Sequence, residues 1–454
     1  MSSCLSDLIK YQRLFQMIFV LGIGGSLQVG LQISMITYTS MHVKKFINET
    51  WQERYGSPLH HETLMLLWSF TVSIFGIGGL LGSMGSGYLT RKYGKKKCLV
   101  CHNLLMLAAA FVMGFSKTAK SFEMILIGRF LCGISAVNAS HSGNGTLATW
   151  SSLRLSHCIL VKTSVNKFNG FICLLPNNFE SFSFTALKQL WGEGNHQGAI
   201  DDMVKEQATT KKMKPMNVLE LLKDRSLRCQ LCLLIIISVT IQLSGINAIY
   251  FYAFDVFRTA GFTQDRIPYI SLGAGTCEFC AAIMCSLIID KFGRRMLLLW
   301  GYGLMALMLM LLTTTLSLQH QFFWMPYCSV ALIFLFIVIF ATGPAGASFP
   351  VMIELFTQSS RSSALVICMS LHWVGLYVIG MIFPYVVKSL GTFCFLIFMG
   401  FISISWILIY RFLPETKGKS VMEIKEGFKH LNFRKKFQAM GENPSDKYTS
   451  CTKL

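Results

Sequence analysis

Four polar side chains interrupt long apolar stretches of this sequence, at positions where a polar group needs a partner. Gln242 and Asn247 lie five residues apart on either side of Gly245. Glu278 and His372 each stand within a further apolar run. Amide and imidazole groups donate and accept hydrogen bonds, which is the chemistry that binds a ring of hydroxyl groups. For two amides considered alone, hydrogen bonding between neighbouring helices is the favoured explanation by about two to one.

The composition of the chain indicates that it lies in a lipid bilayer. Hydrophobic residues make up 53% of the 454 residues, charged residues make up 14%, and the mean hydropathy is +0.51. So many apolar side chains cannot all be buried inside a water-soluble domain. The formal net charge of +19 comes from Lys and Arg in the turns between apolar runs, which is typical of membrane topology. We therefore expect the bilayer, and no nucleic acid, as a partner.

The apolar runs predict an all-α, polytopic membrane protein. A helix needs about 20 residues to cross the hydrocarbon core of a bilayer. Ten runs of suitable length occur, at residues 13–38, 64–88, 98–116, 122–140, 229–256, 267–289, 296–318, 323–353, 362–387 and 391–412.

Two basic turns that contain a glycine indicate an internal duplication. Residues 91–97 and residues 290–295 each join two of the apolar runs. Repeats of this kind build many membrane transporters. However, four runs precede the middle of the chain and six follow it, so the first half is two runs short of a symmetric duplication.

The basic segments also predict an orientation. Lys and Arg favour the cytoplasmic side, so both chain termini are expected there. The loop after the first run is then extracellular, and it contains Asn48 in a glycosylation sequence. Similar sequences at Asn138 and Asn144 fall on the cytoplasmic side and are expected to stay unmodified. The basic segments that set this orientation are 91–97, 291–295 and 430–436.

The middle of the chain departs from the pattern of long apolar runs. Its first part has apolar stretches too short to span a bilayer, and its second part is charged and compatible with helix. We therefore expect an incomplete N-terminal bundle, an atypical segment, a cytoplasmic helical linker, a six-helix C-terminal bundle and a cytoplasmic tail. These are residues 1–140, 141–186, 187–228, 229–412 and 413–454, respectively.

Nothing in the sequence predicts an enzyme or a cofactor. No nucleophile, nucleotide-binding or metal-binding motif stands out. Three Cys-x-x-Cys pairs occur, but no His accompanies them, and buried free thiols are roughly nine times as probable as a metal site. The pairs are Cys98 with Cys101, Cys229 with Cys232, and Cys277 with Cys280.

Four segments together resemble the facilitative hexose transporters, the sugar-porter branch of the major facilitator superfamily. They are residues 242–252, 290–295, 354–361 and the Pro-Glu-Thr-Lys-Gly sequence at 414–418. The resemblance extends over about residues 1–140 and 187–430. It implies two six-helix bundles joined by a cytoplasmic helical domain, with a hexose bound between them near the middle of the plasma membrane. It also implies facilitated diffusion by alternating access, without a covalent step.

The chain departs from this family at residues 140–185, where the family places the end of its fourth helix and all of helices five and six. Two helices and a connector amount to about 50 residues, at about 20 per span. Removal of an even number of spans leaves the orientation of the later helices unchanged. The sequence therefore leaves a second hypothesis open, a product that inserts into the membrane but does not transport.

The resemblance implies a set of substrate-binding residues and reverses the preference stated above for the two amides. His372 followed by Trp, together with Phe349 in place of a Trp, is similar to the fructose-preferring class of the family. Fructose is thus favoured over glucose by about two to one. Either sugar would need side chains that bind hydroxyl groups. The expected substrate-binding residues are Gln242, Asn247, Glu278, Phe349, His372 and Trp373.

Glu278 allows a further alternative, proton-coupled sugar symport. An ionised carboxylate inside a span costs roughly 2.5–3.5 kcal/mol or more, so it must be protonated, paired or exposed to a cavity. A neutral acid that bonds sugar or a neighbouring helix is favoured over a proton relay by about three to one.

The basic turns, together with charged residues at 354 and 361, are expected to form a cytoplasmic gate. Ion pairs there could hold the bundles together and break when the inside opens. The alternative, anchoring of the turns by their positive charge alone, has about one chance in three. Arg91 stands where the family has Asp, so the first turn has lost part of its counter-charge. The expected gating residues are Arg91, Lys92, Gly94, Lys95, Asp290, Gly293, Arg294, Arg295, Glu354 and Arg361.

Overall fold

The computed structural model describes residues 27–150, 216–252, 256–258, 261–263, 266–319 and 321–417, together with Ile424 and Phe428. Within these residues the regular structure is helical, which confirms the all-α fold class. The first half contains α3 (Leu27–Tyr55), α4 (His61–Tyr93), α5 (Lys95–Gly114) and α6 (Glu123–Trp150). The second half contains α10 (Val218–Lys223), α11 (Arg228–Gln242), α12 (Ile246–Phe251), α14 (Ile267–Phe292), α15 (Arg294–Ser317), α16 (Met325–Phe340), α17 (Gly346–Glu354), α18 (Gln358–Leu390) and α19 (Cys394–Phe412).

The described part of each of the ten apolar runs lies mainly in a helix or in helices that follow one another closely. The first run is described only from residue 27, within α3. Five stretches of the described residues are long and apolar enough to cross a membrane, and two further apolar helices are shorter. The five are His61–Ser86, Arg228–Phe251, Arg294–Ser317, Met325–Glu354 and Ser359–Phe412, the last of which holds both α18 and α19. The count of ten spans stays a prediction.

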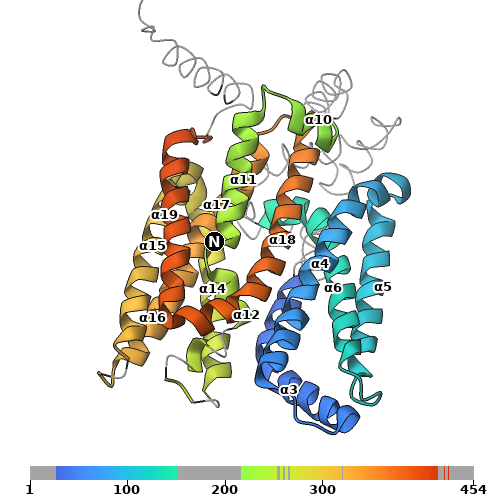
Figure 1. Cartoon of the computed structure of the whole chain (residues 1–454). Helices are drawn as coiled ribbons and strands as arrows, with labels where there is room; N and C mark the ends of the chain where they lie inside the picture. Colours follow the sequence, from blue (N-terminus) through green and yellow to red (C-terminus); the bar gives the residue numbers. More distant parts are fainter. Residues whose placement is uncertain are drawn as a thin grey trace, which may run out of the picture.

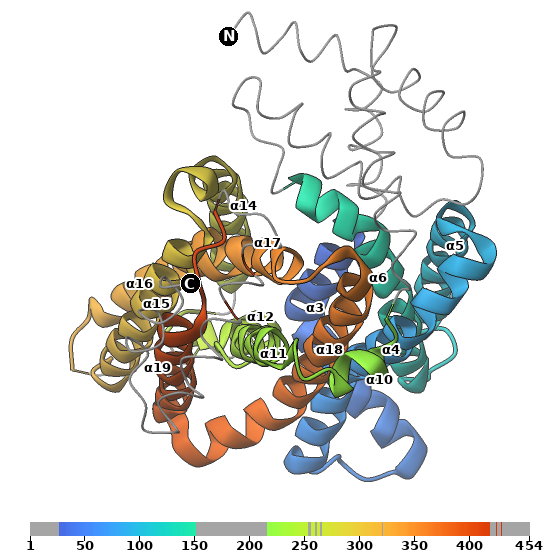
Figure 2. The same cartoon turned by 90° about the horizontal axis from the view of Figure 1, so that it is seen from above.

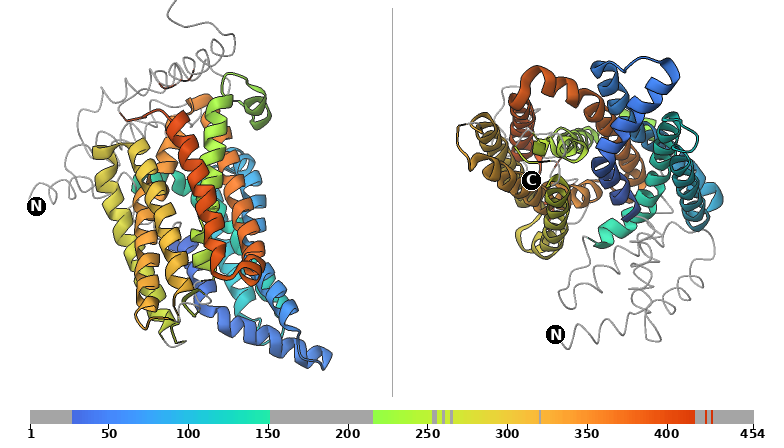
Figure 3. Two further views of the ribbon diagram at one scale, coloured as in Figure 1. Left: turned by 60° about the vertical axis from the view of Figure 1, so that its left-hand side comes forward. Right: turned by 90° about the horizontal axis from the view of Figure 1, so that it is seen from below.

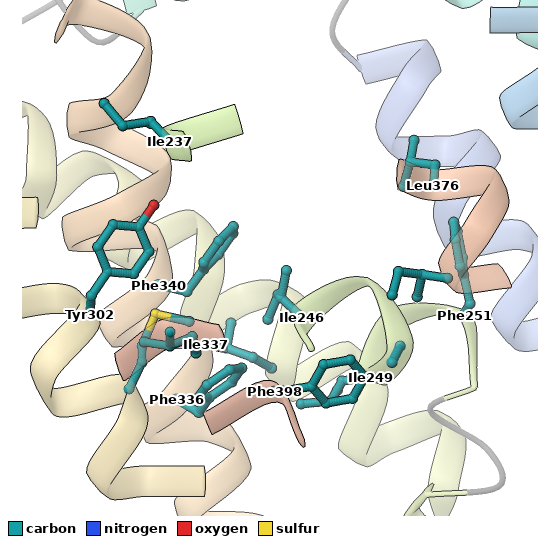
Figure 4. Packing of buried hydrophobic residues seen from close by; sticks show 14 of the residues in the cluster. Ile237, Ile246, Ile249, Phe251, Tyr302, Phe336, Ile337, Phe340, Leu376 and Phe398 are labelled. Carbon is teal, nitrogen blue, oxygen red and sulfur yellow. The ribbon is translucent and has the colours of Figure 1, made fainter. Parts of the chain in front are cut away.

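The helices form two groups that meet along α4 and α18 (Figures 1 and 2). Helices α3 to α6 make the first group, in which α6 packs against both α4 and α5. Helices α11 to α19 make the second, in which α15 packs against α16 and α19. The core of the second group is built from large apolar side chains such as Tyr302, Phe336 and Phe398 (Figure 4). Burial of such side chains holds each group together.

Helices α4 and α18 run antiparallel and approach each other closely at glycines. A Cβ on Gly76 would lie 2.9 Å from the carbonyl oxygen of Trp373, and a Cβ on Gly380 would lie 2.5 Å from Ser73 Oγ. At the end of the contact, Lys388 Nζ lies 2.7 Å from Glu62 Oε1. We call the contact between residues 62–79 of α4 and 373–388 of α18 the seam.

The duplicated basic turns share one backbone conformation. Gly94 joins α4 directly to α5 with φ 82° and ψ 152°, and Gly293 joins α14 to α15 with φ 86° and ψ 161°. Only glycine adopts this region readily, because a Cβ would clash with the backbone. The matching geometry at equivalent places supports the internal duplication.

The helix of the fifth apolar run is interrupted at Gly245. Helix α11 ends at Gln242, and Gly245 adopts φ +86° before α12 begins. A Cβ at this position would lie 2.9 Å from the Phe398 ring. Glycine therefore satisfies two demands here, a left-handed backbone and a close approach to α19.

The residues around Asn48 were expected to form a loop, and this is wrong, because α3 continues through them to Tyr55. Their extracellular side stays a prediction. Ion pairs lie along the part of α3 that follows residue 38. Lys45 and Glu49 pair along the helix at 3.7 Å, and Arg54 pairs with Glu123 of α6. The end of α3 projects from the other helices (Figure 3), and Asn48 is half-buried on it.

The fourth expected span also runs longer than predicted. Helix α6 continues to Trp150, whereas the atypical segment was expected from residue 141. No proline interrupts residues 123–150, so the backbone can remain helical. The rest of the atypical segment, and the expected linker up to residue 215, lie outside the described residues.

The end of the expected linker is helical and is attached to α18. Asn217 and Glu220 form a capping box at the start of α10. The N–H of Met216 donates to the carbonyl of Ser359 at 3.1 Å, and Ser363 Oγ donates to the carbonyl of Met216 at 2.6 Å. Two hydrogen bonds of Met216 thus attach the linker to α18, the helix that carries His372.

Candidate functional site

Gln242 is the centre of a small polar cluster in the second group of helices. Its Nε2 donates to Nδ1 of His372 at 2.6 Å, and its Oε1 accepts from Nδ2 of Asn247 at 2.7 Å. The break at Gly245 brings Asn247 back over Gln242. Gly375 makes room on α18, because a Cβ there would lie 2.4 Å from Gln242 Cγ. The structure therefore joins three of the predicted binding residues.

Trp373 extends this cluster towards the first group of helices. It is 2% exposed, and its ring centroid lies 5.4 Å from that of His372 and 5.5 Å from that of Phe75 on α4. Its indole Nε1 has no hydrogen-bond partner among the described residues. A buried donor of this kind costs about 1–3 kcal/mol unless water or a bound molecule accepts from it.

Glu278 and Phe349 take different places. Glu278 is half-buried on α14, and its carboxyl group interacts with the hydroxyl of Tyr250 on α12. Phe349 is half-buried on α17, and no described hydrogen bond or ring contact joins it to the cluster around Gln242. The hydroxyl of Tyr250 is thus a polar neighbour of the carboxyl group of Glu278.

An ion pair forms between two of the predicted gating residues, and it lies within the second group of helices and does not join the two groups. Arg294 Nη2 lies 3.2 Å from Glu354 Oε1, and both side chains are largely buried. Ion pairs shielded from solvent are screened less by salt than exposed pairs. The contact joins the start of α15 to the end of α17 within the second group of helices.

Other predicted gating residues are arranged differently from expectation. Arg295 does not join Glu354, because its Nη2 donates to the carbonyl of Tyr410 at 2.8 Å and its guanidinium lies over the Tyr410 ring. Arg361 Nη2 donates to the carbonyl of Phe356 at 3.3 Å. Lys92 is exposed beside two tyrosine rings, 5.7 Å and 5.4 Å from their centroids. The side chains of Arg91, Lys95 and Asp290 lie outside the described part of the chain.

Glu415 contacts the turn between α14 and α15, and the sequence analysis did not predict this contact. Its Oε1 accepts from the backbone N–H of Arg294 at 3.2 Å and from those of Thr416 and Lys417 at 3.1 Å. Lys417 Nζ in turn donates to the carbonyl of Lys291 at 2.9 Å. The Pro-Glu-Thr-Lys-Gly sequence could have indicated this contact, because it contains Glu415 and is one of the segments that resemble the family.

The described cysteines are free thiols. In each Cys-x-x-Cys pair the second thiol is exposed on its helix, which corrects the expectation that all are buried. Three residues correspond to almost a full helical turn, so local packing decides which of the two is covered. The exposed thiols are Cys101, Cys232 and Cys280.

Two groups of membrane helices, the second of which carries the polar cluster, are the arrangement of a fold of the major facilitator type. Comparison with solved structures agrees: the proton:xylose symporter XylE bound to 6-bromo-6-deoxy-D-glucose superposes with a TM-score of 0.66. The match has 18% identity and covers 90% of this chain and 98% of that one. The inward open XylE from E. coli gives a TM-score of 0.64 at 18% identity. Both likenesses establish the fold.

Sequence comparison identifies the family. The model of the family described as "Sugar (and other) transporter" matches residues 17–141 and 175–428. Human solute carrier family 2, facilitated glucose transporter member 11, is 32% identical, with 96% of each chain covered. Bovine facilitated glucose transporter member 5 is 31% identical, with 90% of each covered. The chain belongs to the sugar transporter family and is a multi-pass membrane protein.

The family match is interrupted between residues 141 and 175, within the predicted atypical segment. It resumes at residue 175, earlier than the expected position of 187. The alignment with the human relative extends over 478 positions, more than the 454 residues of this chain. Gaps in this chain must therefore fill some of those positions.

Proposed function

We propose that this chain binds a hexose beside Gln242 and, as a facilitative carrier at the plasma membrane, moves it by alternating access. The observation that supports this most directly is the chain of hydrogen bonds from Asn247 through Gln242 to His372. Because Gln242 Nε2 can only donate, His372 Nδ1 accepts, and the neutral imidazole carries its proton on Nε2. Asn247 Oδ1 is then an acceptor and His372 Nε2 a donor, a pair that suits sugar hydroxyls.

We propose fructose as the preferred hexose. His372 supplies an imidazole where the glucose carriers of the family have an amide, and Phe349 supplies a ring without an N–H donor. Fewer fixed donors favour a substrate whose hydroxyl pattern differs from that of glucose. The other residues proposed to contact the sugar are Asn247, Glu278 and Trp373.

Binding of radiolabelled fructose to the purified chain tests this proposal. We expect saturable binding of fructose, displaced by excess unlabelled fructose and less effectively by glucose. The mirror-image sugar, L-fructose, is the matched control, because it has the same polarity but the wrong handedness for a built site. Equal displacement by both mirror images, or no saturable binding, would overturn the proposal.

The Arg294–Glu354 pair and Glu415 are proposed to keep the cytoplasmic ends of α14, α15, α17 and α19 together. Both chain termini are proposed to be cytoplasmic, since the basic turns around Gly94 and Gly293 would then face the cytoplasm. In this arrangement the second group of helices moves as one body while the first moves against it along the seam.

A second candidate function is a transport-silent family member. It is supported by the interruption of the family match between residues 141 and 175 and by the gaps in this chain. A chain of this kind could still bind a hexose in its complete second bundle. Binding without uptake in liposomes would favour this candidate over the carrier.

A further inference from the structure

The ring of Trp373 is held by residues of the first group of helices. Phe75 meets it edge-on, with the ring planes at 70°. Gly79, one helical turn further along α4, lies against its face. Residues four apart share one side of a helix, so α4 presents both contacts to α18 at once.

Gly79 leaves no room for a side chain. A Cβ at this position would lie 2.2 Å from Cδ2 and Cε3 of the Trp373 indole, and 2.7 Å from Cε2. Carbon atoms pack at about 3.5–4.0 Å. Even a methyl group would therefore push the indole ring aside. A Cβ on Gly76 would instead meet backbone atoms, at 2.9 Å from the Trp373 carbonyl oxygen and 3.0 Å from Tyr377 N.

The ring of Phe75 packs in turn against Arg129 of α6. The guanidinium of Arg129 on α6 lies 4.8 Å from the centroid of the Phe75 ring, and its Nη2 reaches the carbonyl of Val72 at 3.4 Å. Arg129 and Phe75 are 3% and 1% exposed. The indole of Trp373 is thus placed against a rigid surface of the first group of helices.

The position of this ring matters to the polar cluster. Trp373 follows His372 directly, and their rings meet edge-on at 82°. The indole Nε1 has no acceptor among the described residues, so where the ring lies decides what it can bond. We propose that Gly79 is a positioning residue for hexose binding: it seats the Trp373 indole and so adjusts the site to the position of the first group of helices. This inference rests on the proposed hexose site.

The test compares glycine-to-alanine changes on α4 in the purified full chain. Gly79→Ala should weaken the binding of radiolabelled fructose at least tenfold. Gly85→Ala is the matched control, because a Cβ there meets nothing within 4 Å, and fructose binding should change less than twofold. Both proteins are compared by thermal unfolding, so that a loss of binding is not confused with a loss of fold.

A second variant separates ring seating from general damage to the seam. Trp373→Phe replaces the indole with a smaller ring and should weaken fructose binding by itself. Adding Gly79→Ala to this variant should weaken fructose binding by less than a further twofold. Gly76→Ala, which meets backbone, should cost the same in either background. Additive effects of Gly79→Ala and Trp373→Phe would overturn the positioning role.

The outcomes distinguish this inference from the proposed function. If the unmodified chain does not bind fructose, the proposed hexose site and the positioning role of Gly79 are both wrong. If it binds fructose and Gly79→Ala binds equally well, the hexose site stands and only the positioning role is wrong.

Discussion

The chemistry of the site depends on which end of the Gln242 amide faces which neighbour. Oxygen faces Asn247 and nitrogen faces His372, so each neighbour keeps one polar atom for a ligand. The side chain of Gln242 is only 2% exposed, and an unpaired amide there would be costly. Gln242 therefore acts through its two partners as well as through any direct contact.

Gln242→Ala and His372→Ala should each weaken hexose binding by about 1–3 kcal/mol, because buried hydroxyls and the remaining partner lose hydrogen bonds. The dissociation constant for fructose, measured by equilibrium binding, reports the effect. Lys223→Ala on α10 is the control, as it is exposed at the surface. Unchanged affinity in both site variants would place the sugar elsewhere.

Glu278 decides between facilitated diffusion and symport. Its carboxyl group interacts with the Tyr250 hydroxyl, which accommodates a neutral acid. We expect uptake by a transport-competent, helix-restored version to be the same with and without an outward-acid gradient, and Glu278→Gln to leave that equality intact. Uptake that rises several-fold with the gradient, and loses this response in Glu278→Gln, would establish proton coupling.

The sequence predicts some of these residues and not others for a physical reason. Gln242, Asn247 and His372 are polar groups inside apolar runs, where burial makes them conspicuous. Glu415 lies in a polar stretch after α19, where one more carboxylate carries no signal of its own. Its contact with the backbone N–H of Arg294 joins residues 121 apart in sequence, which only the folded chain brings together.

At the scale of the elements, the two basic turns depend on glycine. Gly293 combines a positive φ with a close neighbour, since a Cβ would lie 3.0 Å from the Glu415 carboxylate. The turn and the start of α15 are therefore one structural unit.

Gly293→Ala should lower the stability of the purified protein by about 1–3 kcal/mol, the usual cost of a forced backbone conformation. Gly275→Ala on the same helix is a matched control, because a Cβ there meets nothing within 4 Å and alanine favours helix by roughly 0.5–1 kcal/mol. Thermal unfolding in detergent should move in opposite directions for the two variants. Equal shifts would mean that the turn is not strained.

Hydropathy predicted the positions of the helices well and their lengths less well. Helix α3 extends through residues 39–55, where charged residues end the apolar pattern but do not end the helix. Hydropathy reports where lipid ends. It does not report where helical hydrogen bonding ends.

At the scale of the whole molecule, alternating access needs two bundles that move about a shared site. The described residues supply one side of the first bundle, α3 to α6, and all the helices that were expected in the second. The segment that decides the outcome, residues 151–186, lies outside the described part of the chain.

The transport-silent candidate predicts no hexose uptake by the 454-residue chain, because cavity-lining groups without partners cost several kcal/mol each in a bilayer. A version with two helices restored after residue 140 is the comparison, with surface delivery measured for both. Saturable fructose uptake by the purified 454-residue chain in liposomes would contradict this expectation and exclude the transport-silent candidate.

The predicted orientation places Asn48 outside the cell and Asn138 and Asn144 inside. Treatment with an N-glycosidase should shift the electrophoretic mobility of the expressed chain, and Asn48→Gln should abolish the shift. Asn144→Gln serves as the control and should leave it unchanged. A shift that depends on Asn144 would contradict the proposed topology, because it would place Asn144 outside the cell.

The seam between α4 and α18 also sets the order in which the protein can be assembled. Glu62 and Lys388 are 326 residues apart in sequence. At typical rates of about 5–20 residues per second, a ribosome needs roughly 16–65 seconds to synthesise that distance. Throughout this interval the face of α4 that carries Gly76 and Gly79 has no α18 to cover it. Substitutions on this face should therefore appear first as chains retained in the endoplasmic reticulum, before any change in a mature carrier is seen.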